Sequence, residues 1–471
     1  MTTAVELSEI LEHPEYMEPV RYHKELELRG RISRSLVEEI SRIKKEPDWM
    51  RRLRLRALEW FEKLPPPKWL YGIESLDLEE ITSLYVKPLD KPVSDWSELP
   101  PEIRAIYERL RLPEFYAKYL AGISTVLDSE TIYTSYKAIL DELGVIMVSM
   151  DEAVQKYPDI VKQYFSRIYS PLDHKFAALH YALWSGGVFV YVPKNVRVPY
   201  PIEAFFYVGT ELEGQFEHTL VITDEGSELT FIEGCSAPRF KKYSFHDGMV
   251  ELYAHRGSRL TFVTVQNWSR NIINFNNKRA IAEEQAHVEW LEGSIGSRYS
   301  VTYPSTVLRG RGATTTNIVV GIANGPYIKD TGAKVIHAAP ETSSRVISKS
   351  ISSRGGINIY RGIVQINKGA RRSKSFVQCD SLILDEESKA YTYPIIHVME
   401  DDADVGHEAT TGRINEDQLF YLQTRGLSED QAKSIIVLGY IRDMLRGLPL
   451  EYVSMLNRVI QLEFSRLGGV G

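Results

Sequence analysis

Cysteine is scarce in this sequence, with only Cys235 and Cys379 among 471 residues. Two cysteines so far apart along the chain do not form the framework of a small disulfide-rich domain, and they provide no CxxC pair for a metal. The count alone leaves two interpretations open. Both thiols are inert packing residues, or at least one of them has a chemical role.

Signals for export or membrane insertion are also missing. The first sixteen residues contain four glutamates and no lysine or arginine, whereas a secretory signal needs a cationic start and an apolar run. No apolar stretch is long enough to span a bilayer. The net charge of -7 argues against sequence-independent nucleic-acid binding, which requires an excess of cations. We therefore expect a cytoplasmic protein that binds neither membranes nor nucleic acid.

Several common catalytic motifs are absent. The sequence contains no GxxxxGK loop followed by Ser or Thr, no HExxH and no GxSxG. Any step driven by ATP would then need an ATPase supplied by another protein. The sequence thus offers no site of these three kinds.

Residues 1–170 are predicted to form an N-terminal helical domain. Helical periodicity with proline breaks indicates helices over residues 33–45, 48–64, 102–110, 129–143 and 150–164. The second of these contains Arg51, Arg52, Arg54 and Arg56, which we interpret as its solvated face. A docking patch for an acidic partner is the alternative for these arginines.

The pattern changes near residue 185, and residues 171–413 are predicted to form a β-helix core. Short alternating runs rich in Val, Ile, Thr, Tyr and Phe follow turns that contain charged residues or glycine, as in 224–233, 255–265 and 283–291. A β-sandwich would also show many short strands. The long recurrence of turns without helices, the alternation, and helices at both ends favour a solenoid.

Helical periodicity returns after Arg413, so residues 414–471 are predicted to form a C-terminal helical domain. Asn415 can cap a first helix that Gly426 ends, and Ser428 with Gln431 matches a capping box for a second helix. A last helix is expected over residues 450–467.

Besides Cys235, the candidates for metal chemistry are Cys379, His407 and Glu408. Val377, Cys379 and Ser381 share one face of a strand, but the pattern does not decide whether that face is inside or outside. His407 and Glu408 are neighbours, so both could reach one metal only at a bulge or a strand end. Stable iron–sulfur sites generally use four cysteines, so a cluster here would need mixed ligands or a second chain.

A set of short motifs in a fixed order resembles the SufB family of iron–sulfur cluster assembly scaffolds, a branch of the SufB/SufD core family. They are the stretches 191–196, 233–238, 265–268, 330–334, 347–350, 360–362, 378–381, 407–410 and 416–421. Each is weak alone, but their order and number make the match specific, and the resemblance covers essentially the whole chain, most strongly residues 185–450. The resemblance implies a right-handed parallel β-helix between helical regions and a scaffold on which a nascent cluster is built and then passed to apoproteins. From this resemblance we expect that the chain is not an enzyme by itself.

The resemblance also implies partners and cofactors. The C-terminal helices are expected to bind SufC, an ABC-type ATPase, and the second core subunit is SufD or a second copy of this chain. A sulfur donor and recipient apoproteins complete the set. The cargo expected is a transient iron–sulfur cluster of the 4Fe–4S type, and members of the family can also bind reduced flavin.

The resemblance also implies roles for individual residues, namely those at positions that match the functional positions of the family. Cys379 matches the proposed cluster-ligand cysteine, with His407 and Glu408 as co-ligands. Cys235 matches the proposed sulfur acceptor, and Gln266, Trp268 and Lys278 match positions proposed to line the route for sulfur. Since a persulfide needs a thiolate, we expect the surroundings of Cys235, Lys278 above all, to lower its pKa. Thr306 stands where some members have a cysteine, and the N-terminal cysteine cluster of other members is missing.

Three other functions remain possible on sequence grounds. The first is a SufD-like structural partner without cluster ligands, against which Cys379 and His407-Glu408 argue. The second is a β-helix polysaccharide lyase or hydrolase, which would act through carboxylates in an external groove and would be expected to carry a signal peptide. The third is an interaction subunit that regulates an ATPase and whose cysteines are incidental.

Overall fold

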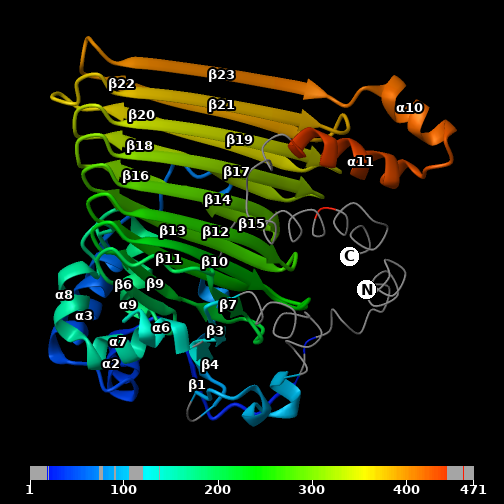
Figure 1. Cartoon of the computed structure of the whole chain (residues 1–471). Coiled ribbons are helices and arrows are strands. Elements are labelled where there is room, and N and C mark those ends of the chain that lie inside the picture. The colour runs from blue at the N-terminus through cyan, green and yellow to red at the C-terminus, as the bar shows by residue number, and fades with distance from the viewer. Residues whose placement is uncertain are drawn as a thin grey trace.

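The chain forms a β-solenoid of about eight turns with helices at its two ends (Figure 1). The computed structural model describes residues 21–442 except 74–77, 90–91, 105–119 and 137, together with Pro19 and Ile460. Two largely parallel sheets face one another, and the chain alternates between them from β10 onward. The predicted parallel β-helix with flanking helical regions is confirmed.

The first sheet has ten strands in the described part of the chain. In spatial order they are β23 (Asp404–Arg413), β21 (Lys374–Ile383), β19 (Ser343–Ser353), β17 (Thr314–Asn324), β14 (His287–Gly296), β12 (Arg259–Trp268), β10 (Glu228–Ser236), β7 (Ile202–Tyr207), β3 (Gly122–Leu127) and β4 (Glu130–Tyr136). Only β4 runs antiparallel to its neighbour.

The second sheet covers the opposite side of the solenoid. Its main path is β22 (Lys389–Val398), β20 (Ile357–Ile366), β18 (Ile328–His337), β15 (Tyr299–Thr302), β13 (Ile272–Ala282), β11 (Ser244–Ala254), β9 (His218–Thr223), β6 (Val188–Val192) and β5 (Ile146–Ser149). Two short strands join it, β16 (Ser305–Leu308) beside β13 and β18, and β8 (Gly214–Gln215) beside β11.

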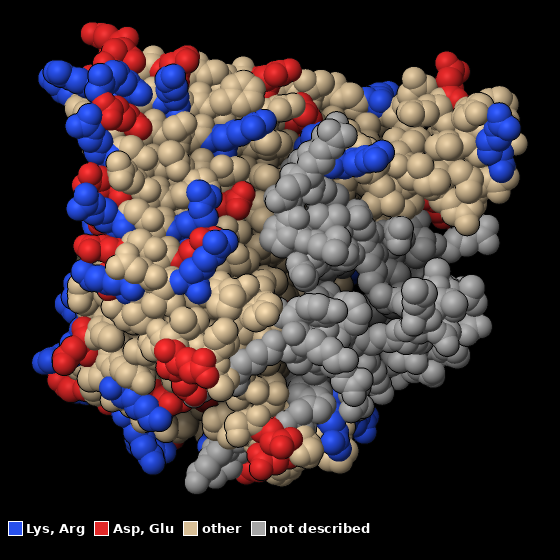
Figure 2. Space-filling model, viewed as in Figure 1, with Lys and Arg blue, Asp and Glu red and all other residues tan. Residues whose placement is uncertain are grey.

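Turns with a left-handed residue connect the two sheets at one edge. Gly226 and Gly257 occupy this position in successive coils, each with φ of 67°, a conformation that favours glycine. Charged side chains of both signs pair from coil to coil along the same edge, as Arg309 does with Glu283 and Arg311 with Glu341. Figure 2 shows Lys and Arg interspersed with Asp and Glu along this edge, so the edge is neither strongly positive nor strongly negative.

The N-terminal region combines helices with strands. The helices predicted over 33–45 and 48–64 are α2 (Arg34–Ile43), capped by the Ser33 side chain, and α3 (Asp48–Lys63). The pattern over 150–164 forms two helices, α7 (Met150–Lys156) and α8 (Pro158–Tyr164), and α9 (Lys175–Leu183) follows. Residues 101–104 are helical, and the rest of the predicted 102–110 helix lies outside the described residues.

Further short elements complete this region. β1 (Leu26–Arg29) pairs with β2 (Ser83–Lys87), and single 3₁₀ turns occur as η3 (Leu78–Glu80) and η4 (Trp96–Glu98).

The helix predicted over residues 129–143 is wrong. Its first half is strand β4, which follows a tight turn at Asp128, with φ of 52°, and pairs with β3. Only α6 (Ala138–Glu142) is helical. The residues of β4 are mostly β-branched or aromatic, and pairing with β3 decides their conformation over the weak helical periodicity.

The C-terminal helices are α10 (Glu416–Thr424) and α11 (Glu429–Ile441), and Figure 1 places them beside the ends of the last strands. The capping box of Ser428 and Gln431 is confirmed, since each side chain bonds the other's backbone N–H. Buried Val437 and Ile441 belong to one apolar cluster with outward-facing residues of the first sheet, and Lys349 of β19 donates to the backbone carbonyl of Tyr440, so α11 lies on the outer face of that sheet. The predicted 450–467 helix lies outside the described residues.

No helix among the described residues is long and apolar enough to cross a membrane.

Candidate functional site

The two cysteines face the same interior surface of the first sheet. Glu233 of β10 aligns with Thr264, Glu292, Val319, Ser348 and Cys379 in successive strands, and Cys235 aligns with Gln266, Ser294, Gly321, Ser350 and Ser381. These two rows lie side by side because residues two apart in a strand share a face. Five strand-to-strand steps separate the cysteines, which amounts to ~24 Å at the usual spacing.

Cys379 lies on β21 close to His407 of β23, at the end of the solenoid. Cys379 Sγ is 3.2 Å from His407 Nε2, and it also lies 3.6 Å from the backbone carbonyl oxygen of Glu408. The register explains the contact, because Val377 pairs with His407 and Cys379 pairs with the next inward residue, Ala409. Burial raises the pKa of the Cys379 thiol to about 11, and the Asp380 carboxylate adds to the shift.

Glu408 does not join this pair within the described chain. β23 pairs regularly with β21 through this stretch, so successive side chains point to opposite faces. Glu408 aligns with Gln378 and is exposed, whereas His407 is partly buried. Among the described residues, no group of three or more His, Cys, Asp and Glu side chains could hold a metal ion. Of the three candidate ligands, only Cys379 and His407 thus lie together.

Cys235 lies near the end of β10 with its side chain inside the solenoid. It is 2% exposed and packs in the main hydrophobic core with Phe206 and Trp268. The pKa of its thiol is raised well above the ordinary value, first by burial and then by the carboxylates of Glu233 and Glu217, while Lys278 acts in the opposite direction. The expectation of a lowered thiol pKa is therefore wrong, because one buried lysine does not offset desolvation and two nearby carboxylates.

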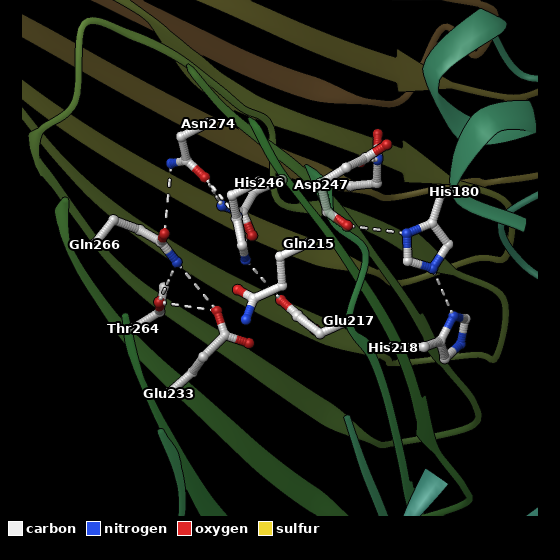
Figure 3. A network of polar contacts seen from close by, with 12 residues as sticks. His180, Gln215, Glu217, His218, Glu233, His246, Asp247, Thr264, Gln266 and Asn274 are labelled. Carbon is white, nitrogen blue, oxygen red and sulfur yellow. Dashed lines mark hydrogen bonds and ion pairs between the residues drawn. The ribbon is translucent and has the colours of Figure 1, made fainter. Parts of the chain in front are cut away.

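The three route residues carried over from the resemblance lie together around Cys235. Trp268 Nε1 donates to Gln266 Oε1 at 2.6 Å, and Gln266 Nε2 donates to Glu233 Oε1 at 3.1 Å. Lys278 Nζ is 3.4 Å from Glu233 Oε1 and 2.8 Å from Glu292 Oε2, and all three side chains are almost completely buried. Figure 3 shows Gln266, Thr264 and Glu233 joined in this network.

The network extends to residues that the motifs did not single out. His246 and Asn274 of the second sheet connect to Gln266, and Glu217 lies 3.3 Å from His246 Nε2. Burial lowers the pKa of His246 to about 3 and raises the pKa of Glu217 well above its usual range. No clear signal in the sequence marked them, because Glu217, His246 and Asn274 stand in stretches rich in other polar residues and only the fold buries them.

A second group of buried histidines lies outside the solenoid, between α9 and the second sheet. His180 Nε2 is 3.1 Å from His218 Nδ1, and His218 Nε2 is 3.2 Å from Glu251. Glu251 also accepts the backbone N–H groups of residues 166, 168 and 169. These contacts anchor the loop before α9, so this group has a structural role.

Thr306, which stands where some relatives have a cysteine, is buried on β16. Its hydroxyl accepts the indole N–H of Trp290 at 3.0 Å and lies 3.1 Å from the hydroxyl of Thr315.

Comparisons with known proteins identify the family. A family model described as "SUF system FeS cluster assembly, SufBD core domain" matches residues 205–440, and one described as "SufBD protein N-terminal region" matches residues 119–204. The chain belongs to the SufBD family. Iron–sulfur cluster assembly SufBD family proteins of Staphylococcus epidermidis, S. saprophyticus and S. aureus are each 41% identical over 440 residues, covering 93% of this chain and 94% of theirs.

The boundaries of the two family matches correspond to structural parts of the chain. The core-domain match begins within β7 and ends within α11, so it includes every strand from β8 to β23 and both cysteines. The N-terminal match covers β3 to β6 and the helices between them. The SufBD family assignment makes this chain an iron–sulfur cluster assembly protein, as the resemblance predicted.

Proposed function

We propose that this chain is a SufB-type scaffold, on which an iron–sulfur cluster is built and from which it is passed to apoproteins. The observation that carries the proposal is the Cys379–His407 pair, with Sγ and Nε2 3.2 Å apart on the inward face of the last coil. Thiolate and imidazole are both competent iron ligands. A SufD-like partner without cluster ligands would have no need for such a pair.

The position of the pair favours a cluster shared with a second chain. β22 and β23 are the last strands of their sheets, so each has one edge without a partner strand among the described residues. Exposed apolar side chains gather there, namely Tyr393, Ile395, Ile396, Val398 and Met399, at 43–53% exposure. A SufD subunit or a second copy that covers these edges would bring further ligands to the cluster, and Glu408 would face the junction from the outer side.

Sulfur enters at β10, which is the end of the two interior rows farthest from Cys379. Cys235 accepts sulfane sulfur from a donor, and Gln266, Trp268 and Lys278 line the start of its route. The ~24 Å between the cysteines rules out direct transfer from thiol to thiol, and the chain has no third thiol to carry sulfane sulfur, so sulfur leaves Cys235 as sulfide and crosses the interior toward β21. Release of sulfide from a persulfide takes two electrons and two protons, and a reduced flavin is the donor class that the family suggests.

The C-terminal helices are the proposed docking site for the SufC ATPase. Val437 and Ile441 of α11 are buried against the sheet, while Phe420 and Tyr421 of α10 and Ile435 of α11 are 68%, 55% and 47% exposed. Exposed aromatic side chains in a cluster are typical of interface anchors. One helix pair thus covers the solenoid with one side and presents an apolar surface with the other.

Anaerobic reconstitution tests the scaffold function. Wild type, Cys379→Ser and Cys235→Ser are supplied with ferrous iron and sulfide, and bound cluster is measured by visible absorption and by iron and sulfide content. We expect Cys379→Ser to lose the cluster and Cys235→Ser to retain it, because free sulfide bypasses the acceptor. Normal cluster content in Cys379→Ser would refute the proposed ligand, and binding of acidic polysaccharide would favour the lyase-like alternative.

A further inference from the structure

The hydrogen-bond network beside Cys235 fixes the protonation of a buried histidine, starting from a group that can only donate. The indole N–H of Trp268 bonds Gln266 Oε1 at 2.6 Å, which settles the orientation of that amide. Asn274 Nδ2 donates to the same oxygen at 3.4 Å. The carbonyl oxygen of Asn274 therefore faces His246 Nδ1, 2.9 Å away, and must accept a hydrogen from it. His246 carries its proton on Nδ1 and a lone pair on Nε2.

The bare Nε2 atom faces a group of acceptors that have no donor. It lies 3.3 Å from Glu217 Oε1, yet neither atom has a hydrogen-bond partner among the described residues, nor do Glu217 Oε2 and Asn276 Oδ1. His246 and Glu217 are fully buried, and Asn276 is 4% exposed. Figure 3 shows His246 and Glu217 pointing toward one another.

A glycine leaves space where these atoms converge. A Cβ atom on Gly248 would lie 2.4 Å from Glu217 Oε1, 2.8 Å from Asn276 Oδ1 and 3.1 Å from His246 Cε1, the ring carbon bonded to Nε2. Any other residue at this position of β11 would push the three side chains apart. A carboxylate, an amide oxygen and the Cε1–Nε2 edge of an imidazole thus converge beside Gly248.

We propose that Glu217, His246 and Asn276 form an interior binding site for one divalent cation of the iron(II) class. Two ligands each ~2.1 Å from one ion lie ~3.0 Å apart in octahedral and ~3.4 Å apart in tetrahedral geometry, which brackets the 3.3 Å between Nε2 and Oε1. Imidazole, carboxylate and amide oxygen suit Fe²⁺, Mn²⁺ and Zn²⁺. Only two of the three are His, Cys, Asp or Glu, and water would complete the shell.

The competing occupant is a proton on Glu217. A protonated carboxyl could donate to His246 Nε2, which would satisfy that lone pair and leave Asn276 Oδ1 without a donor. The cation instead contacts all three side chains. It would also lie in the same interior as Cys235, whose thiol interacts electrostatically with Glu217. The site extends the proposed function without depending on it, because ion binding requires neither sulfur nor Cys379.

The test measures iron binding by the full-length Cys379→Ser variant, in which the proposed cluster ligand is gone. Ferrous iron is added without oxygen or sulfide, excess ion is removed by gel filtration after long incubation, and bound iron is counted. Glu217→Gln and His246→Gln are made in the same background. Glu203→Gln is the matched control, because Glu203 is a buried carboxyl on the outward face of β7. Circular dichroism checks that each variant folds.

We expect one iron per chain in Cys379→Ser and in the Glu203→Gln control, with affinity at least about tenfold weaker in the Glu217 and His246 variants. X-ray absorption of the Cys379→Ser complex should show nitrogen and oxygen ligands, including imidazole, and no sulfur. This spectrum decides the matter even if a site variant fails to fold. No bound iron, binding that all variants share equally, or an iron–sulfur path to Cys235 would each overturn the assignment. If the wild type fails to assemble a cluster in the anaerobic reconstitution described above, that result would count against the scaffold proposal and not against this ion site.

Discussion

Cys379 Sγ lies 3.2 Å from His407 Nε2, while Glu408, the next residue, points to the other face of the same strand. The contact crosses two neighbouring coils, so it depends on the register between β21 and β23. A slip of one residue would exchange His407 for Glu408 on the inner face. Because His407 and Glu408 point to opposite faces, substitutions of the two residues should have different effects.

We predict different effects for substitutions of the two neighbours. His407→Ala should reduce the cluster bound after anaerobic reconstitution severalfold or more, because it removes a side chain in direct contact with the thiol. Glu408→Ala should leave cluster binding by the isolated chain nearly unchanged, and should matter only when a second subunit covers the edge. Absorption and iron content measure both, and equal losses in the isolated chain would contradict the geometry.

Thiol reactivity should differ strongly from that of an ordinary cysteine. With a pKa of about 11, Cys379 is ~0.1% thiolate at pH 8, and its alkylation should rise about tenfold for each pH unit up to pH 10. The two thiols are almost equally buried, with Cys379 3% and Cys235 2% exposed, but Cys379 lies one strand from the end of the first sheet and Cys235 lies deep in the stack. Cys235 should therefore stay unmodified until the chain unfolds. Peptide mass spectrometry after iodoacetamide treatment measures both sites, with the urea-unfolded chain as control. Rapid labelling of Cys235 in the folded chain would show that the interior opens there.

Glu203 should make the fold less stable as pH rises. Burial raises its pKa to about 8, so the unfolded chain loses this proton at lower pH than the folded chain. Stability is therefore lost progressively from about pH 4.5 to pH 8. Glu203→Gln should increase the free energy of unfolding by roughly 2–4 kcal/mol at pH 8.5 and by little at pH 4.5.

Urea titrations at the two pH values measure this difference. The half-exposed Glu228 is the control, and Glu228→Gln should change stability by less than about 0.5 kcal/mol at both. A Glu203→Gln gain that does not depend on pH would disprove the ionisation argument.

Surface substitutions in the C-terminal helices should separate docking from folding. Phe420→Ser with Tyr421→Ser should weaken binding of the SufC ATPase at least about thirtyfold without lowering thermal stability, since both rings are exposed. Val437→Ser should lower stability instead, because Val437 is buried against the sheet. Calorimetry of partner binding and thermal melts measure the two effects. Undiminished binding by the double variant would place the docking surface elsewhere.

Truncation is a less informative test of docking. Removing residues from Ser428 onward would also remove Val437 and Ile441 from the apolar cluster on the outer face of the first sheet. A loss of binding could then reflect a damaged solenoid rather than a missing contact.

Local patterns in the sequence were sufficient for the architecture. Alternation of side chains, recurrent turns such as the one at Gly226, and the capping box at Ser428 are each set within a few residues, so they predicted the solenoid and its C-terminal helices. The motifs around Cys379 and His407 located the candidate cluster site. These signals do not depend on distant parts of the chain.

Other features were decided by contacts between distant residues. Arg54 looked like its neighbours in a basic helix, yet it is fully buried, bonded to Glu46 and to the backbone carbonyl of Trp184. The first half of the 129–143 segment forms strand β4, because it pairs with β3.

The chemistry of the interior was also decided by contacts between residues that are distant in the sequence. The register of the coils placed Cys379 inside with His407, and burial together with nearby carboxylates raised the pKa of both thiols. The bare Nε2 of His246 follows from a chain of hydrogen bonds that joins β11, β12 and β13. Desolvation, register and hydrogen-bond direction depend on which strands meet, and that is a property of the folded chain rather than of any stretch of its sequence.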